Sequence, residues 1–135
     1  MKKFLFLTFF FACSLGTFAQ SSDYAPQMAT SSIYNKDAKF LMFPTKNRYI
    51  FLKLNTRTGE VWMVQYATGT EDALEVKIES WRYPLVKPEE ESNGRFMLYP
   101  TQNIYNFILL DQIDGRIWQV QWDFDERNRG IFKIG

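Results

Sequence analysis

The chain has 135 residues and a formal net charge of +1, and 18% of its residues are aromatic. This length fits one hydrophobic core, and the near-neutral charge excludes the basic field that binding to nucleic acid or to an anionic membrane would need. The sequence holds no histidine and one cysteine. The commonest general base and the usual zinc ligands are therefore missing, and we expect no cofactor and no metal.

The N-terminal segment has the pattern of a secretory signal peptide. Two lysines follow the initiator methionine and precede an apolar run over residues 4–12. Thr17 and Ala19 supply the small residues before a predicted cut at Gln20. The sequence therefore predicts residues 1–19 as a signal peptide and export to the periplasm, the cell surface or the medium. The apolar run is far below the ~20 residues of a membrane span, so no transmembrane helix is expected.

Cys13 lies inside this predicted signal peptide. Lipid anchoring through Cys13 is the less favoured interpretation, because Phe10 stands three positions upstream, where a branched aliphatic residue is usual. Removal of residues 1–19 leaves no cysteine and 14 basic against 15 acidic residues, so neither a disulfide nor a thiol nucleophile is expected. The next segment, residues 20–37, is rich in Ser, Ala, Thr and Gln and is predicted as a flexible tether.

A tandem repeat organises the rest of the chain. Residues 40–79 align without a gap to residues 96–135 at an offset of 56, and thirteen of the forty aligned positions are identical. Chance does not produce such an alignment, so we interpret it as a duplication within a single β domain over residues 38–135. The predicted segments of this domain are repeat one over 38–79, a solvated connection over 80–94 and repeat two over 95–135.

Each repeat is predicted as four strands, because short aromatic and β-branched runs are bounded by turn residues. A Pro-Thr-x-Asn turn, at 44–47 and 100–103, joins the first two strands, where proline presets φ and asparagine tolerates the left-handed conformation. A leading Asn or Asp and a final glycine, at 55–59 and 111–115, predict a capped hairpin with a positive-φ glycine. The predicted strands are Phe40–Phe43, Tyr49–Leu54, Glu60–Tyr66 and Leu74–Glu79, then Phe96–Tyr99, Tyr105–Leu110, Arg116–Trp122 and Ile131–Ile134.

These units predict an all-β fold of two tandem four-stranded antiparallel repeats. Strand alternation places Trp62 and Tyr66 on one face of the third strand, and repeat two places Trp118 and Trp122 on the equivalent face. We expect this tryptophan face to be the core face in both repeats. The repeats pack either as a pseudo-twofold sandwich or as a closed eight-stranded barrel, and the sequence does not decide between these arrangements.

The sequence of repeat two carries a resemblance to known proteins. Residues 95–103 and 110–122 are similar to a group of small, uncharacterised exported proteins of Bacteroidetes with a duplicated Tyr-Pro-Thr-x-Asn-x-Tyr-x-Phe repeat. This resemblance covers both repeats and implies a compartment and a fold rather than an activity. Leu110, Gly115 and Trp118 also resemble the blade motif of quinoprotein propellers. Two copies are too few for a propeller ring, so no quinone site is inferred.

Four residues are candidates for binding. Gln65, Gln119 and Gln121 lie opposite the tryptophan face, where they donate hydrogen bonds to a ligand or stand as exposed strand residues or a cross-strand pair. Trp81 lies in the connection between the repeats, next to an arginine and a tyrosine. That setting suits an interface anchor, a platform for a sugar ring or a cap on the core.

The acidic residues are interpreted as structural. Asp111 and Asp114 suit turn capping better than calcium binding, because repeat one has asparagine and threonine at the equivalent positions. Residues 123–126 hold three acids that the arginines following them neutralise in a solvated loop. The alternative for this loop is a calcium site or an acid/base pair.

We therefore hypothesise an exported binding module without catalysis, which contacts another envelope or secreted protein as an adaptor, an inhibitor or an immunity protein. The first alternative is a carbohydrate-binding protein, which requires at least one tryptophan or tyrosine at the surface. The second alternative is a glycan-active enzyme, which requires two carboxylates that face each other across a cleft.

Overall fold

The computed structural model describes residues 35, 37–67, 69, 73–80 and 84–135. The predicted signal peptide, nearly all of the predicted tether and Trp81 lie outside these residues. No helix in the described part of the chain is long and apolar enough to cross a membrane.

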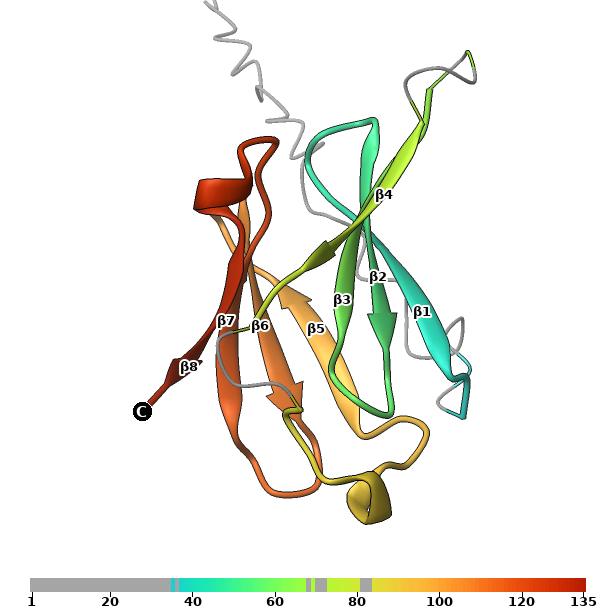
Figure 1. Cartoon of the computed structure of the whole chain (residues 1–135), viewed down its shortest axis with the longest axis vertical. Coiled ribbons are helices and arrows are strands. Elements are labelled where there is room, and N and C mark those ends of the chain that lie inside the picture. Colours follow the sequence, from blue (N-terminus) through green and yellow to red (C-terminus); the bar gives the residue numbers. More distant parts are fainter. Residues whose placement is uncertain (1–34, 36, 68, 70–72, 81–83) are drawn as a thin grey trace, which may run out of the picture.

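The domain consists of two four-stranded antiparallel sheets, each a meander in which neighbouring strands follow one another in the chain. Figure 1 shows the sheets as separate layers, with repeat one in cyan to yellow-green and repeat two in orange to red. The predicted strands are confirmed to within two residues at each end. The strands are β1 Phe40–Pro44, β2 Ile50–Asn55, β3 Val61–Gln65 and β4 Leu74–Ile78, then β5 Phe96–Pro100, β6 Asn106–Asp111, β7 Ile117–Gln121 and β8 Gly130–Ile134.

The hairpins between β2 and β3 and between β6 and β7 form as the turn residues predict. The Oδ1 atom of Asn55 accepts the backbone N–H of Arg57 at 3.1 Å, and the carboxylate of Asp111 caps the second turn in the same way. Gly59 and Gly115 close these turns with φ of 77° and 79°, a conformation that costs a side-chain-bearing residue about 1–2 kcal/mol.

The Pro-Thr-x-Asn turns work differently from the expectation. No described residue other than glycine has a positive φ, so the asparagines do not adopt the left-handed conformation. Instead, Asn47 Oδ1 accepts the N–H of Tyr49 at 3.0 Å, and Asn103 Oδ1 accepts the N–H of Tyr105 at 2.9 Å. Asparagine is therefore used here as a side-chain acceptor for the turn backbone.

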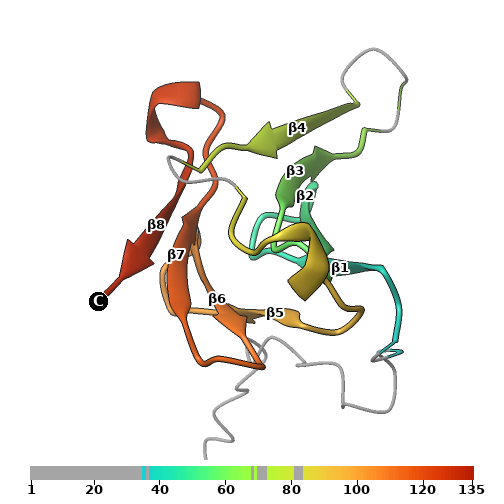
Figure 2. The ribbon, with the colours of Figure 1, turned by 60° about the horizontal axis from the view of Figure 1, so that its bottom comes forward.

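The two sheets face each other and do not join into a closed ring of strands, so the sandwich is confirmed and the closed eight-stranded alternative is wrong. Two backbone hydrogen bonds between described residues join the sheets. The N–H of Phe96 donates to the carbonyl of Thr56 at 2.8 Å, and the N–H of Ile131 donates to the carbonyl of Glu79 at 3.0 Å. Figure 2 shows the second contact, where the chain leaves β4 and reaches β8.

The two repeats bury opposite faces of their sheets. In repeat two the tryptophan face is the core face, as expected, with Trp118 and Trp122 buried. In repeat one this expectation is wrong, because Met63 on the opposite face is buried while Trp62 is half-exposed and Tyr66 is 47% exposed. The same sequence pattern therefore points inward in one repeat and outward in the other.

This arrangement differs from the expected pseudo-twofold relation. A twofold axis pairs the same surface of both copies. Here the sheet of repeat one packs with one face, and the sheet of repeat two packs with the other, so the repeats stack front to back. The apolar residues buried between them are Leu41, Phe43, Ile50, Leu52, Leu54, Val61, Met63 and Ile78 from repeat one and Phe96, Leu98, Phe107, Leu109, Trp118, Val120, Trp122 and Ile131 from repeat two.

The connection between the repeats contributes to this core, which corrects its interpretation as a solvated segment. Leu85 and Val86 are buried, and a 3-10 helix over Pro88–Glu90 follows them at the surface. Beyond this helix the side chain of Arg95 is buried against Asp111, with its Nη2 atom 2.8 Å from Oδ2. The ion pair ties the start of β5 to the end of β6.

Candidate functional site

The outer face of the first sheet holds the most distinctive exposed cluster in the described part of the molecule. Because side chains alternate along β1, β2 and β3, the residues that repeat two buries are presented here to solvent. Strand β4 adds the charged Glu75, the register partner of Val64, to the same face. We call this surface the aromatic face; its residues are Phe40, Met42, Tyr49, Phe51, Lys53, Trp62, Val64, Tyr66 and Glu75.

The rings of the aromatic face contact one another in two groups. Phe40 meets Trp62 edge to face with ring centroids 6.3 Å apart. Tyr66 contacts both Tyr49 and Phe51, with centroid separations of 5.8 Å and 6.0 Å. Each ring is held by its neighbours on a rigid sheet, so little side-chain entropy remains to be lost when a partner binds.

A cation lies over the first group of rings. The Nζ atom of Lys53 is 4.6 Å from the ring centroid of Trp62 and 5.7 Å from that of Phe40, and it also forms an ion pair with Glu75. The charges of this pair cancel within the face. Lys77, the register partner of Trp62 on the same face, is neutralised in the same way by Glu60 at 2.7 Å, and the cations of Lys39 and Arg48 lie 5.5 Å and 5.1 Å from the rings of Phe40 and Tyr49. The surface is thus aromatic with a charged margin, which suits an apolar partner with a few polar groups or the face of a sugar ring.

The predicted binding residues Gln119 and Gln121 lie on a different surface, the outer face of the second sheet. Gln119 Nε2 donates to Asn106 Oδ1 at 3.2 Å and to Gln121 Oε1 at 3.4 Å, so the amides form a chain along β6 and β7. We call this surface the amide face; it comprises Tyr99, Asn106, Ile108, Leu110, Ile117, Gln119, Gln121 and Phe132.

The structure does not bring all predicted site residues together. Gln65 pairs with Ile50 and Leu74 in the register of the first sheet, and it is half-buried on the face that packs against repeat two. It is therefore separated from Gln119 and Gln121 by the core, although it is the sequence equivalent of Gln121. Trp81 lies outside the described residues, so its predicted role is not tested.

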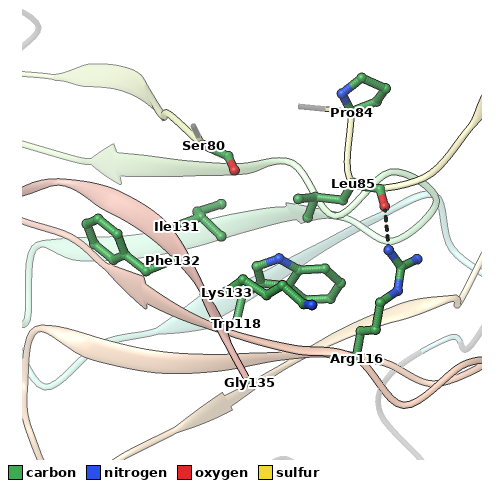
Figure 3. A pocket seen from close by; sticks show the side chains of 9 residues that line it. All are labelled: Ser80, Pro84, Leu85, Arg116, Trp118, Ile131, Phe132, Lys133 and Gly135. Atoms are coloured by element: carbon green, nitrogen blue, oxygen red, sulfur yellow. Dashed lines mark hydrogen bonds between the residues drawn. The ribbon is translucent and has the colours of Figure 1, made fainter. Parts of the chain in front are cut away.

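A pocket of about 750 Å³ opens between the connection and β8 (Figure 3). Trp118 and Ile131 form part of its wall, and Arg116 reaches across to donate to the carbonyl of Leu85 at 3.2 Å. Lys133 adds a second cation. No acidic side chain is among the described residues that line this pocket, so it offers no pair of carboxylates facing each other.

The acids of the β6–β7 hairpin are held by arginines. Arg95 and Arg116 both contact the carboxylates of Asp111 and Asp114, and the shortest of these distances is 2.6 Å, between Arg116 Nε and Asp114 Oδ2. Burial opposes ionisation of Asp114, but the hydrogen bonds from Arg116 outweigh it and lower the pKa of this carboxyl.

Asp125 has the same kind of partner in the loop before β8. Its carboxylate caps the 3-10 helix Glu126–Asn128 by accepting the N–H of Arg127, and the guanidinium of Arg127 lies 2.6 Å away. Hydrogen bonding to Arg127 lowers the pKa of Asp125. The turn capping predicted for Asp111 and Asp114 and the neutralisation of Asp125 by Arg127 are confirmed.

The sequence does contain the signal that identifies the aromatic face. Lys53 and Glu75 occupy the positions where repeat two has Leu109 and Ile131, which are buried. A lysine and a glutamate buried without water are costly, so the face that carries them in repeat one belongs in solvent. The reciprocal substitution of Met63 by Gln119 marks the opposite face of repeat two in the same way.

Comparisons with known proteins give no relative of this chain: no family model, no curated protein and no solved structure matches it. The resemblance of its repeats to exported Bacteroidetes proteins accordingly stays a prediction.

Proposed function

We propose that the chain is an exported, non-catalytic binding module that contacts another envelope or secreted protein through the aromatic face. A role as an adaptor, an inhibitor or an immunity protein fits this description. The observation that supports it is the exposure of Phe40, Tyr66 and Tyr49 on one rigid sheet, together with a half-exposed Trp62.

Aromatic residues and methionine are enriched at the cores of protein interfaces. Monomeric proteins rarely leave a contiguous apolar patch of this kind uncovered, so a partner is the simplest reason for it. The equivalent positions of repeat two show that this set of side chains packs well when it is covered. Phe40 and Tyr66 are each 47% exposed, whereas their equivalents Phe96 and Trp122 are fully buried.

The proposal of a non-catalytic protein is supported by residue types. The sequence contains no histidine, and its single cysteine falls within the predicted signal peptide. Asp111, Asp114 and Asp125 are engaged by arginines, as described above, which supports a binding module over the glycan-active enzyme.

Carbohydrate binding is the second candidate, because it requires at least one tryptophan or tyrosine at the surface and the structure has such residues. Tyr49 and Tyr66 are exposed next to each other, and Trp62 is half-exposed in the same sheet. A row of aromatic rings on a β scaffold is a suitable surface for stacking with sugar rings. The two candidates share the surface and differ in the partner.

The test is a capture experiment with the tagged chain from Gln20 onward, a detergent-treated envelope fraction of the source cells and light crosslinking. The Phe40→Ser/Tyr66→Ser variant alters the aromatic face. Phe124→Ser is the control, since Phe124 is a phenylalanine of the β7–β8 loop that is 57% exposed, against 47% for Phe40. We expect the control and the wild type to capture the same protein and the double variant to lose it.

Capture that is identical for all three proteins would contradict this site. A glycan panel measured by calorimetry on the same three proteins decides between the candidates. If a polysaccharide binds the wild type and the control but not the double variant, and no protein is captured, the partner is a glycan and not a protein.

A further inference from the structure

The packing between the two repeats is a template for packing between two molecules. Within one chain, the inner face of the first sheet lies against the inner face of the second sheet. Because the repeats bury opposite faces, each outer face is the sequence equivalent of an inner face of the other repeat. The two inner faces pack together at the centre of the molecule, and the sequence equivalent of each inner face is exposed at one end of the molecule.

The equivalence on the aromatic face is close. Phe40, Trp62 and Val64 correspond to Phe96, Trp118 and Val120 in the alignment of the repeats. The latter three are buried against repeat one. The aromatic face thus keeps most of the side chains by which repeat two packs on the sheet in front of it.

The equivalence on the amide face runs the other way. Leu110, Ile108 and Ile117 correspond to Leu54, Leu52 and Val61, which form the inner face of repeat one. They are half-exposed at the outer end of the molecule. The amide face thus keeps equivalents of the aliphatic side chains of repeat one against which repeat two packs.

We infer that a second copy of this chain docks by placing its aromatic face on the amide face of the first, and so repeats the internal interface head to tail. This inference rests on the proposed function, because it names the protein that the aromatic face contacts. It also gives a binding role to Gln119 and Gln121, which lie within the amide face.

A backbone contact accompanies the internal interface and has equivalents at both ends. The N–H of Phe96, on the edge strand β5, donates to the carbonyl of Thr56 in the β2–β3 turn. The equivalent groups in the alignment are the N–H of Phe40 on edge strand β1 and the carbonyl of Gln112 in the β6–β7 turn. In the head-to-tail pair these two groups belong to different copies and are brought to the same relation.

Polar residues make the contact between copies weaker than the contact within the chain. The aromatic face has Lys53 with Glu75 where the internal interface has leucine and isoleucine, and the amide face has Asn106 and Gln119 where it has isoleucine and methionine. Once buried, these polar groups must form hydrogen bonds with the second copy. This requirement lowers the affinity and fixes the register in which the two faces dock. No residue that defines the amide face is charged, so like charges do not oppose the contact, and we expect reversible, concentration-dependent association.

Head-to-tail docking leaves one free aromatic face and one free amide face on every assembly. Such heterologous contacts continue into larger assemblies, which are rings if the rotation closes and filaments if it does not. A contact between two identical faces would stop at a dimer. This difference makes the inference testable with two variants.

Sedimentation equilibrium of the chain from Gln20 onward, over a wide range of concentrations, is the experiment. Phe40→Glu blocks the aromatic face, and Tyr99→Glu blocks the amide face; both residues are exposed on their strands. Phe124→Glu in the β7–β8 loop is the control. We expect the wild type and the control to associate beyond a dimer, and each blocked variant to associate about 100-fold more weakly, as for a desolvated charge at an interface hot spot.

The mixture of the two blocked variants is the decisive sample. Each variant retains the face that the other has lost, so an equimolar mixture should form a one-to-one heterodimer that grows no further. Circular dichroism of each variant verifies that it is folded. A wild type that stays monomeric, or association that one variant abolishes and the mixture does not restore, overturns the inference. If the wild type is monomeric while the Phe40→Ser/Tyr66→Ser variant still loses a captured protein, the proposed function stands without a second copy as its partner.

Discussion

Truncation of two equivalent phenylalanines should have very different effects on stability. Phe40 and Phe96 are the same residue at the same position of the two repeats, yet Phe40 is 47% exposed and Phe96 is fully buried. Phe96 packs on Trp118 with ring centroids 6.0 Å apart, and a Cβ placed on Gly59 would lie 3.1 Å from its ring. Removal of this ring leaves a cavity between the two sheets.

The magnitude follows from burial. Phe96→Ala should lower the free energy of unfolding by about 3–5 kcal/mol, the range for a phenylalanine removed from a well-packed core. Phe40→Ala should cost about 1 kcal/mol or less, because it removes the edge-to-face contact with Trp62 and exposes little buried apolar surface. The expected difference is therefore at least about 2 kcal/mol between two substitutions of identical chemistry.

A reciprocal pair excludes the explanation that repeat two is simply the more stability-determining half. Leu54 and Leu110 are also equivalent and identical, but Leu54 is fully buried and Leu110 is half-exposed. Leu54→Ala should cost about 2–5 kcal/mol, and Leu110→Ala less. The phenylalanine substitution thus costs more in repeat two, whereas the leucine substitution, on the opposite face of the sheet, costs more in repeat one.

Urea unfolding followed by tryptophan fluorescence measures all four variants, with the denaturant dependence checked for constancy. If Phe96→Ala is too unstable to fold, the Phe→Leu pair at the same two positions gives smaller differences of the same sign. Equal losses for Phe40 and Phe96, or for the two leucines, would refute opposite-face packing and with it the template for head-to-tail docking.

Three further predictions concern the hairpins. Arg95→Met should destabilise the protein by about 3–5 kcal/mol because it leaves the buried Asp111 carboxylate without its main partner, and adding Asp111→Asn should recover part of this loss in the same urea assay. The folded state lowers the pKa of Asp114 from 3.8. The ionised carboxylate therefore stabilises the fold above pH 3.8, and this contribution is lost as the pH falls through the folded pKa. The urea midpoint should drop more between about pH 6 and pH 3 in the wild type than in Asp114→Asn. Gly59→Ala should cost more than Gly115→Ala, measured by thermal unfolding, because both have positive φ but the new Cβ at Gly59 meets a leucine methyl at 2.7 Å while that at Gly115 meets nothing within 4 Å.

The local structure of this protein could be predicted from its sequence because local chemistry determines it. The turns at 55–59 and 111–115 need an acceptor at the start and a glycine at the end, and both are present in the sequence. The eight strands lie between such turns and follow a period of two. The repeat alignment then predicted two equivalent four-stranded sheets, and the fold confirms it.

The candidate site could be predicted only in part. Gln119 and Gln121 do lie together on one outer face, but the third predicted glutamine, Gln65, lies on an inner face. The aromatic face was missed because Trp62 was expected to behave as Trp118 does. Lys53 and its partner on β4 were the available signal, since their equivalents in repeat two are apolar.

The sequence by itself determined the duplication, the strands and the turns, because each depends on residues within a few positions of one another. Only the tertiary structure decided which face of each sheet became the core. Both faces of both sheets carry enough large apolar side chains to form one, so alternation within a strand does not distinguish them. The choice depends on how two whole sheets stack, and front-to-back stacking gives identical residues, such as Phe40 and Phe96, opposite environments.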